Sequence, residues 1–371
     1  MPDVRIIVGP DVVADAALLQ EVAERECAAL DVTLGREGEA VVVVSSDPDL
    51  AGQFPGAVWL DLARNDHGPD IHGRGVAGLT WAVRRAVHRR RHPGEIVAYG
   101  THPDQWAELH LPPGPGPHPV VALVHGGYWR SIWGADLMDA LCVDLRERGF
   151  AAWNLEYRRP DLHGWEATAA DVTDGLRRLA TLDVPLDLDK VAVAGHSAGG
   201  QLALRAAADL AADEKPGNGP ALSAALAVSL AGVLDLVEGD RRWLSSGAVR
   251  SALGAVGPAG PGLAPGLTHL PAGVEPVTGV EPSLYQSELF NSVYGDASPL
   301  HRLPLGVRQL IVQGRSDDLD LVDFARRYAR AAKEAGDDVT YLEMSGDHFA
   351  VINPKAPIWQ TTALAIANAL R

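Results

Sequence analysis

Short, continuous apolar segments alternate with segments of helical periodicity from residue 95 to the end of the chain, and this alternation constrains the fold strongly. The apolar segments with the pattern of buried strands are 120–124, 151–155, 191–194, 225–230, 309–312 and 339–342. The predicted helices between and after them span 136–148, 166–180, 199–212, 322–335 and 359–370. Strands that are apolar along their whole length and separated by helices predict a mostly parallel sheet covered on both faces. Two further strands, 96–99 and 106–111, are expected to pair antiparallel at its start.

The same alternation occurs on a smaller scale before residue 95. Strands predicted over 4–8, 40–44 and 57–60, with helices over 11–30 and 75–88, indicate a small α/β layer. Pro93 and Gly94 then interrupt the pattern, as is typical of a break between elements. We therefore predict a small N-terminal α/β domain over residues 1–94, without an assigned role, and a larger domain over residues 95–371.

The sequence GHSAGG (residues 195–200) directly follows the predicted strand 191–194 and opens a predicted helix. A serine among small residues at such a turn is typical of a nucleophile elbow, which is so sharp that only small residues fit around the serine. The serine then lies at a helix N-terminus, where the helix dipole favours a developing negative charge. Ser197 is the predicted nucleophile. The alternative is a glycine-rich turn that carries an ordinary serine.

A second glycine-rich motif, HGGYW at residues 125–129, follows the strand 120–124. Acyl transfer needs two backbone N–H groups directed at the oxyanion that develops on the substrate carbonyl. One is expected from Ala198, after the nucleophile, and the other from Gly126 or Gly127, because glycine lets a backbone approach the substrate closely. These three residues are the predicted oxyanion hole. The alternative is a turn that serves packing alone.

A general base and its orienting acid are expected later in the chain, in the order Ser, Asp or Glu, His. Asp317 follows the strand 309–312, and His348 follows the strand 339–342. Both therefore lie at carboxyl ends of strands, where open α/β sheets place their sites. We predict His348 as the base and Asp317 as the acid. Rival candidates for the acid are Asp318, Asp320 and Asp235.

With these motifs, residues 95–371 resemble the α/β-hydrolase family. Within that family, HGGYW with GHSAG resembles kynurenine formamidase and related small carboxylesterases. The resemblance implies an eight-stranded sheet, a Ser-Asp-His triad, and Gly126 and Gly127 in the oxyanion hole. Two features depart from it: residues 1–94 have no counterpart, and a Gly/Pro-rich insertion at about 249–282 is longer than expected. We expect the insertion to be mobile and to cover the substrate pocket; the alternative is an insertion on the outer surface.

The motifs together predict a serine hydrolase that cleaves a small ester or amide through an acyl-enzyme intermediate, as a carboxylesterase or an arylformamidase. No cofactor or metal is expected, because zinc-, ATP- and NAD-binding patterns are missing from the sequence. Tyr128, Trp129 and His196 are predicted to line the substrate pocket. Further aromatic candidates are Trp133, Trp165, Trp243, Tyr285, Phe290 and Phe349. The alternative class is a non-catalytic binding or scaffold module on the same fold.

The chain is acidic, with a net charge of −16 over 371 residues, which disfavours nucleic acid as a partner. One segment of this acidic chain is basic and contains Arg84, Arg85 and the run 89–91. They are either a phosphate-binding patch or, as we favour, the basic last turn of a helix. The segment 71–75 before that helix presents a similar choice between an anion site and a tight turn, and we favour the turn.

Nothing in the sequence suggests a membrane or a secretory route. No apolar run approaches the roughly 18 residues of a membrane helix, and residues 1–5 lack the layout of a secretory signal. Cys27 and Cys142 support neither a disulfide framework nor a zinc site. We therefore expect a cytoplasmic protein whose partner is a small-molecule ester or amide, with no nucleic acid or membrane partner. Homo-oligomer formation is left open.

Overall fold

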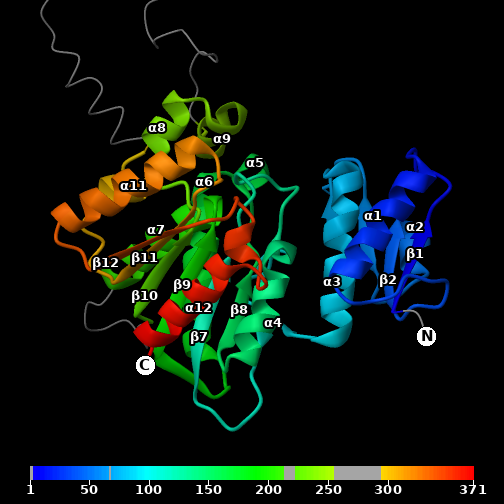
Figure 1. Cartoon of the computed structure of the whole chain (residues 1–371), viewed down its shortest axis with the longest axis horizontal. Helices are drawn as coiled ribbons and strands as arrows, with labels where there is room; N and C mark the ends of the chain where they lie inside the picture. Colours follow the sequence, from blue (N-terminus) through cyan, green and yellow to red (C-terminus); the bar gives the residue numbers. More distant parts are fainter. Residues whose placement is uncertain (1–2, 67, 213–221, 255–293) are drawn as a thin grey trace, which may run out of the picture.

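The computed structural model describes residues 3–66, 68–212, 222–254 and 294–371 (Figure 1). Most of the insertion at about 249–282, which is expected to cover the pocket, lies outside these residues, and so do Tyr285 and Phe290. The described start of that segment differs from the prediction, because residues 249–253 are the end of helix α9 (Leu244–Leu253). Val249 and Ala252 are buried against the core, which explains why this stretch is helical. The helix ends at Gly254 in the left-handed conformation, with φ 66°.

The larger part of the chain contains one eight-stranded sheet with the order β12-β11-β10-β9-β7-β8-β6-β5. The strands are β5 (Glu95–Ala98), β6 (Trp106–His110), β7 (His118–Val124), β8 (Ala151–Leu155), β9 (Leu186–His196), β10 (Leu226–Leu230), β11 (Gln309–Gly314) and β12 (Val339–Met344). The strands from β12 to β8 in this order run parallel to one another. Strand β6 pairs antiparallel with β8, and β5 pairs antiparallel with β6. The predicted α/β-hydrolase fold is confirmed.

Helices cover both faces of this sheet, which is why its strands are apolar throughout (Figure 1). In β7, Val120, Ala122 and Val124 pack into one core cluster, while Val121 and Leu123 pack into the other. The first cluster includes residues of α6 (Trp165–Arg177), α7 (Ala198–Ala212) and α11 (Leu319–Glu334). The second includes residues of α4 (Asp139–Glu147) and α12 (Pro357–Ala369). Within the described residues, no helix combines the length and apolarity needed to cross a bilayer.

Residues 3–94, the N-terminal unit, form a separate four-stranded parallel sheet with the order β1-β2-β3-β4. Its elements are β1 (Val4–Val8), α1 (Ala16–Ala29), β2 (Ala40–Val44), α2 (Pro48–Gly52), β3 (Val58–Asp61), β4 (Ile71–His72) and α3 (Gly78–Arg91). Strand β4 and helix α2 are not predicted from the sequence, because each is too short to show a period. Figure 1 shows the unit in blue, beside the larger part of the chain, and α3 contacts α4.

The basic segment of α3 is not a phosphate patch, because each of its guanidinium groups pairs with a carboxylate. Arg85 is buried, and its Nη1 lies 2.7 Å from Oδ1 of Asp139 in α4. Arg74, in the segment 71–75, likewise pairs with Asp136 at 2.5 Å. The remaining pairs lie within the N-terminal unit: Arg84 with Glu26, Arg89 with Asp70, Arg90 with Glu39, and Arg91 with Asp3. The arginines therefore join parts of this chain.

Candidate active site

Ser197 lies in the turn between β9, which ends at His196, and α7, which begins at Ala198. Its φ of 55° is left-handed, and its N–H donates to the carbonyl oxygen of Leu230 at 2.9 Å. A non-glycine residue adopts this conformation only where the surrounding structure enforces it. Close packing does so here, since a Cβ at Gly199 would lie 2.1 Å from the carbonyl oxygen of Val124. The turn therefore has the geometry of a nucleophile elbow.

His348 and Asp317 come together from the loops after β12 and β11. His348 Nδ1 lies 2.9 Å from Asp317 Oδ2, and the carboxylate side chain is almost fully buried. Gln313 Nε2 donates to the same oxygen at 2.9 Å, and the N–H of Asp318 donates to Oδ1 at 2.7 Å. Because an ionised carboxylate only accepts, Nδ1 of His348 carries the proton and Nε2 keeps a lone pair. The ring is thus in the tautomer that a general base needs.

The rival acids have other partners. Asp318 caps α11 by accepting the N–H of Asp320. Asp320 pairs with Arg242 at 2.7 Å, and Asp235 pairs with Arg327 at 2.8 Å. Of the candidate acids from the sequence, the structure brings Asp317 against His348.

The loop after β7, residues 125–136, is called the glycine loop below. It lies directly against the elbow, because a Cβ at Gly126 would lie 2.9 Å from Cβ of Ser197 and 2.5 Å from the carbonyl oxygen of His196. Gly127, Tyr128 and Trp129 all have positive φ, which turns the chain sharply away after this contact. Ala198 supplies the first N–H of α7, and such N–H groups have no partner within their helix. Two backbone segments suited to an oxyanion therefore meet beside Ser197.

A buried network that sequence reasoning missed holds the start of this loop. His125 contacts the carbonyl oxygen of Gly126 through Nδ1 at 2.8 Å and Glu156 Oε1 through Nε2 at 3.1 Å. Tyr157 stacks on the His125 ring, with centroids 4.3 Å apart, and donates to the His125 carbonyl oxygen at 2.8 Å. Burial opposes the charge on Glu156, but Arg159 and His125 outweigh it and lower its pKa to about 2. The signal available in the sequence was the position of Glu156 and Tyr157 directly after β8.

Replacing Glu156 by Ala should lower the free energy of unfolding by about 3–5 kcal/mol, because it removes the more buried of the two carboxylates that pair with Arg159. The folded-state pKa of Glu156 is depressed, so its contribution is fully present above the ordinary carboxyl pKa of 4.5 and is lost as the pH falls toward 2. Urea unfolding at pH 7 and pH 3 measures both effects. A variant that loses equal stability at the two pH values would contradict this assignment.

Of the three predicted pocket residues, only Tyr128 is partly exposed. Burial and the charges of Asp318 and Asp317 raise the pKa of its phenol. The side chains of Trp129 and His196 are 2% and 1% exposed, and their place in the substrate pocket stays a prediction. Left-handed backbone directs Trp129 into the core, where its indole donates to Gln201 at 3.0 Å. His196 lies beneath the loop of His348 and contacts its carbonyl oxygen through Nε2 at 2.9 Å.

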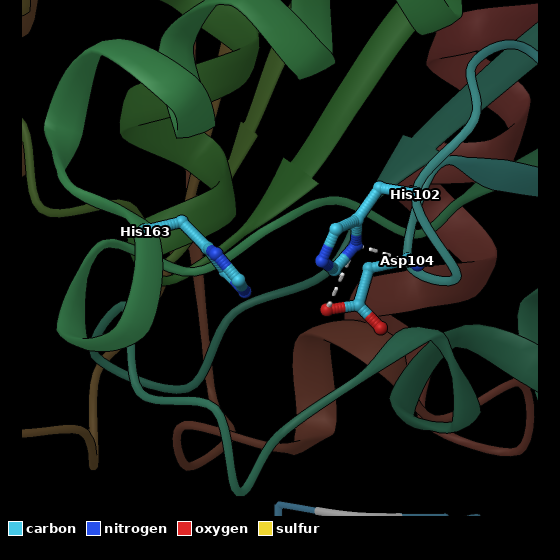
Figure 2. Close-up of side chains that lie close together, drawn as sticks. All are labelled: His102, Asp104 and His163. Atoms are coloured by element: carbon cyan, nitrogen blue, oxygen red, sulfur yellow. Dashed lines mark hydrogen bonds and ion pairs between the residues drawn. The ribbon is translucent and has the colours of Figure 1, made fainter.

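Among the described residues, one group has the composition of a metal site: His102, Asp104 and His163 (Figure 2). The two imidazole rings are 4.6 Å apart, one edge against the other's face. His102 Nδ1 accepts the N–H of Asp104 at 3.1 Å, so the neutral ring carries its proton on Nε2. Arg159 also pairs with Asp104 at 3.3 Å. His102 and Asp104 are therefore engaged with partners in the protein, and none of the three residues belongs to the motifs around Ser197.

The comparisons with known proteins agree with this architecture. A family model described as BD-FAE matches residues 108–250. Esterase 2 of Thermogutta terrifontis, phosphoramylated by tabun, is 21% identical with a TM-score of 0.52, covering 76% of this chain and 95% of that one. Esterase LipW of Mycobacterium marinum is 19% identical with a TM-score of 0.55, covering 77% and 85%. Esterase B of Lactobacillus rhamnosis is 17% identical with a TM-score of 0.57, covering 78% and 92%. No curated protein matches the chain in sequence.

Proposed function

We propose that this α/β-hydrolase is a serine esterase that cleaves a small ester through an acyl-enzyme intermediate. The observation that carries the proposal is the 2.9 Å contact between His348 and Asp317, which leaves Nε2 of the imidazole free to accept a proton. Ser197 supplies the nucleophile from the elbow, and the match to a BD-FAE family model includes this turn. No cofactor is required by this chemistry.

In the proposed reaction each of the three side chains has one role. His348 Nε2 takes the proton of Ser197 Oγ as the oxygen attacks the substrate carbonyl carbon. The N–H of Ala198, with that of Gly127 or Gly126, donates to the resulting oxyanion. His348 then gives the proton to the leaving oxygen, which departs and leaves the acyl group on Ser197. Water, deprotonated by His348, attacks the acyl carbon; His348 then returns this proton to Ser197 Oγ as the acid is released, and Asp317 stabilises the imidazolium in both steps.

A short acyl chain is part of this proposal. Structures of the Thermogutta esterase 2 carry propionate or butyrate, and esterase B is inhibited by a tributyrin phosphonate. An aryl formamide is the second candidate substrate, because the HGGYW motif resembles that of formamidases. Trp129 of this motif lies in the core, where its indole donates to Gln201. It therefore supports the glycine loop and does not distinguish an ester from an aryl formamide.

The first test is covalent labelling by a fluorophosphonate probe. The purified protein should be labelled stoichiometrically at Ser197, because a phosphonate captures a serine that is activated by a base. Ser197→Ala should abolish labelling, whereas Ser223→Ala, before β10, should leave it unchanged. A protein that is not labelled would support the binding-module alternative instead. Turnover of p-nitrophenyl acetate and butyrate beside aryl formamides then separates the esterase from the amidase.

A further inference from the structure

We infer that the N-terminal unit supports the active site through Trp81 of α3. Trp81 is a positioning residue for the glycine loop and for the loop that carries His348. The second loop, residues 345–352, is called the histidine loop below. The inference rests on the proposed function. It assigns a role to a part of the chain for which the sequence predicts none.

The N-terminal unit holds the glycine loop through its backbone and its side chains. Arg74 Nε donates to the carbonyl oxygen of Ile132 at 2.6 Å, and its guanidinium lies over the Trp133 ring at 4.3 Å. Arg64 Nη2 donates to Ser131 Oγ at 3.0 Å. These contacts involve three consecutive residues of the loop. The far part of the loop is therefore anchored to the N-terminal unit, while His125 and Glu156 anchor its start.

Trp81 continues this anchorage toward the oxyanion glycines. Its ring meets the Trp133 ring edge to face, with centroids 6.3 Å apart. Trp133 in turn lies directly against Gly127, because a Cβ at Gly127 would lie only 2.2 Å from Cβ of Trp133. A displacement of Trp133 is thus transmitted to the backbone that is proposed to bind the oxyanion.

The same ring of Trp81 reaches the histidine loop. Its centroid lies 5.8 Å from that of Phe349, the residue after His348. Phe349 lies 5.5 Å from the His348 ring and 5.7 Å from the His196 ring. Trp81 therefore contacts neighbours of both proposed catalytic groups at once, and it comes from helix α3 of the N-terminal unit.

The histidine loop is held on one side by the core, where Val351 and Ile352 are buried, and it borders a cavity on the side of Trp81. Trp81, Phe349 and Ala350 line a cavity of about 630 Å³ between the N-terminal unit, α4 and the histidine loop. Phe349 itself remains 45% exposed. On this side few other groups contact Phe349, so the ring of Trp81 has a large effect on its average position.

Trp81→Ala is expected to lower kcat by about 10–100-fold with less than about a threefold change in KM, since small misplacements of reacting groups are costly to the chemical step. Trp81→Phe should restore kcat to within about threefold, because a phenyl ring still reaches both neighbours. Fluorophosphonate labelling of Ser197 should slow in proportion to kcat. Hydrogen exchange in residues 127–136 and 346–352 should increase in Trp81→Ala.

Trp59→Ala is the matched control. Trp59 lies in β3 of the same unit, and its indole donates to the carbonyl oxygen of Ser45. Its loss should destabilise the unit while kcat stays within about twofold. Equal losses of kcat in Trp81→Ala and Trp59→Ala would overturn the inference, as would unchanged exchange in both loops. If the wild-type protein is not labelled while exchange in the loops responds to Trp81→Ala, the proposed function fails and the positioning role of Trp81 stands.

Discussion

Ser197→Ala and His348→Ala should each lower kcat by about 10⁴–10⁶-fold, and the double variant should be little worse than either single variant. Members of a triad act as a unit, because a nucleophile without its base, or a base without its nucleophile, cannot perform the attack. Steady-state and single-turnover hydrolysis of p-nitrophenyl butyrate measures the loss. The rate that remains would come from the backbone N–H groups of Ala198 and the glycine loop.

The control for this pair is a histidine outside the site. His163→Ala, at the exposed end of helix α5 (Pro160–His163), should keep kcat within about threefold. Thermal unfolding of each variant establishes that the fold is retained. Losses that add in the Ser197 and His348 double variant would contradict their action as one unit.

Asp317→Asn should lower kcat by about 10²–10⁴-fold through the wrong imidazole tautomer. Asp317 Oδ2 accepts from Gln313 and His348, and Oδ1 accepts the N–H of Asp318. An amide places an NH2 group at one of these two positions. At the first it donates to His348 Nδ1 and leaves the proton on Nε2, where it blocks the attack; at the second it opposes the N–H of Asp318. Neither orientation satisfies all partners.

Asp318→Asn is the matched control, since it changes the neighbouring carboxylate, which caps α11, and leaves the contact with His348 in place. Asparagine is also a good cap, so kcat should change by less than about threefold. The pH profile of kcat/KM should retain its shape in Asp318→Asn and change in Asp317→Asn. A greater loss in Asp318→Asn, or in Asp235→Asn, would show that the acid has been misassigned.

The fold and the backbone of the site follow from the sequence because they depend on local patterns. Parallel strands bring their carboxyl ends to one edge, so residues after β9, β11 and β12 had to gather there. The predictions of Ser197, Asp317 and His348 combine this rule with the elbow motif and the order of a triad along the chain, and the structure places Asp317 and His348 in contact.

Side-chain directions did not follow, because they depend on torsion angles that the pattern does not encode. Trp129 belongs to the HGGYW motif at the site, yet its backbone has positive φ and its indole bonds to Gln201 in the core. The partners of His125 and Arg85 lie 31 and 54 residues away in the sequence, so no local period connects them. A cluster of arginines shows where charge lies and does not show which carboxylates will meet it.

The junction between the N-terminal unit and α4 has a consequence for how this chain can diverge. Arg85 and Asp139 are both buried, as are the side chains of Arg74 and Asp136. A buried pair adds little net stability, but losing one member leaves an uncompensated charge that is strongly destabilising. Arg74 and Asp136 are therefore expected to covary among descendants of this sequence, as are Arg85 and Asp139. An N-terminal unit transplanted from another hydrolase would dock in the right orientation only if it brought arginines at both positions.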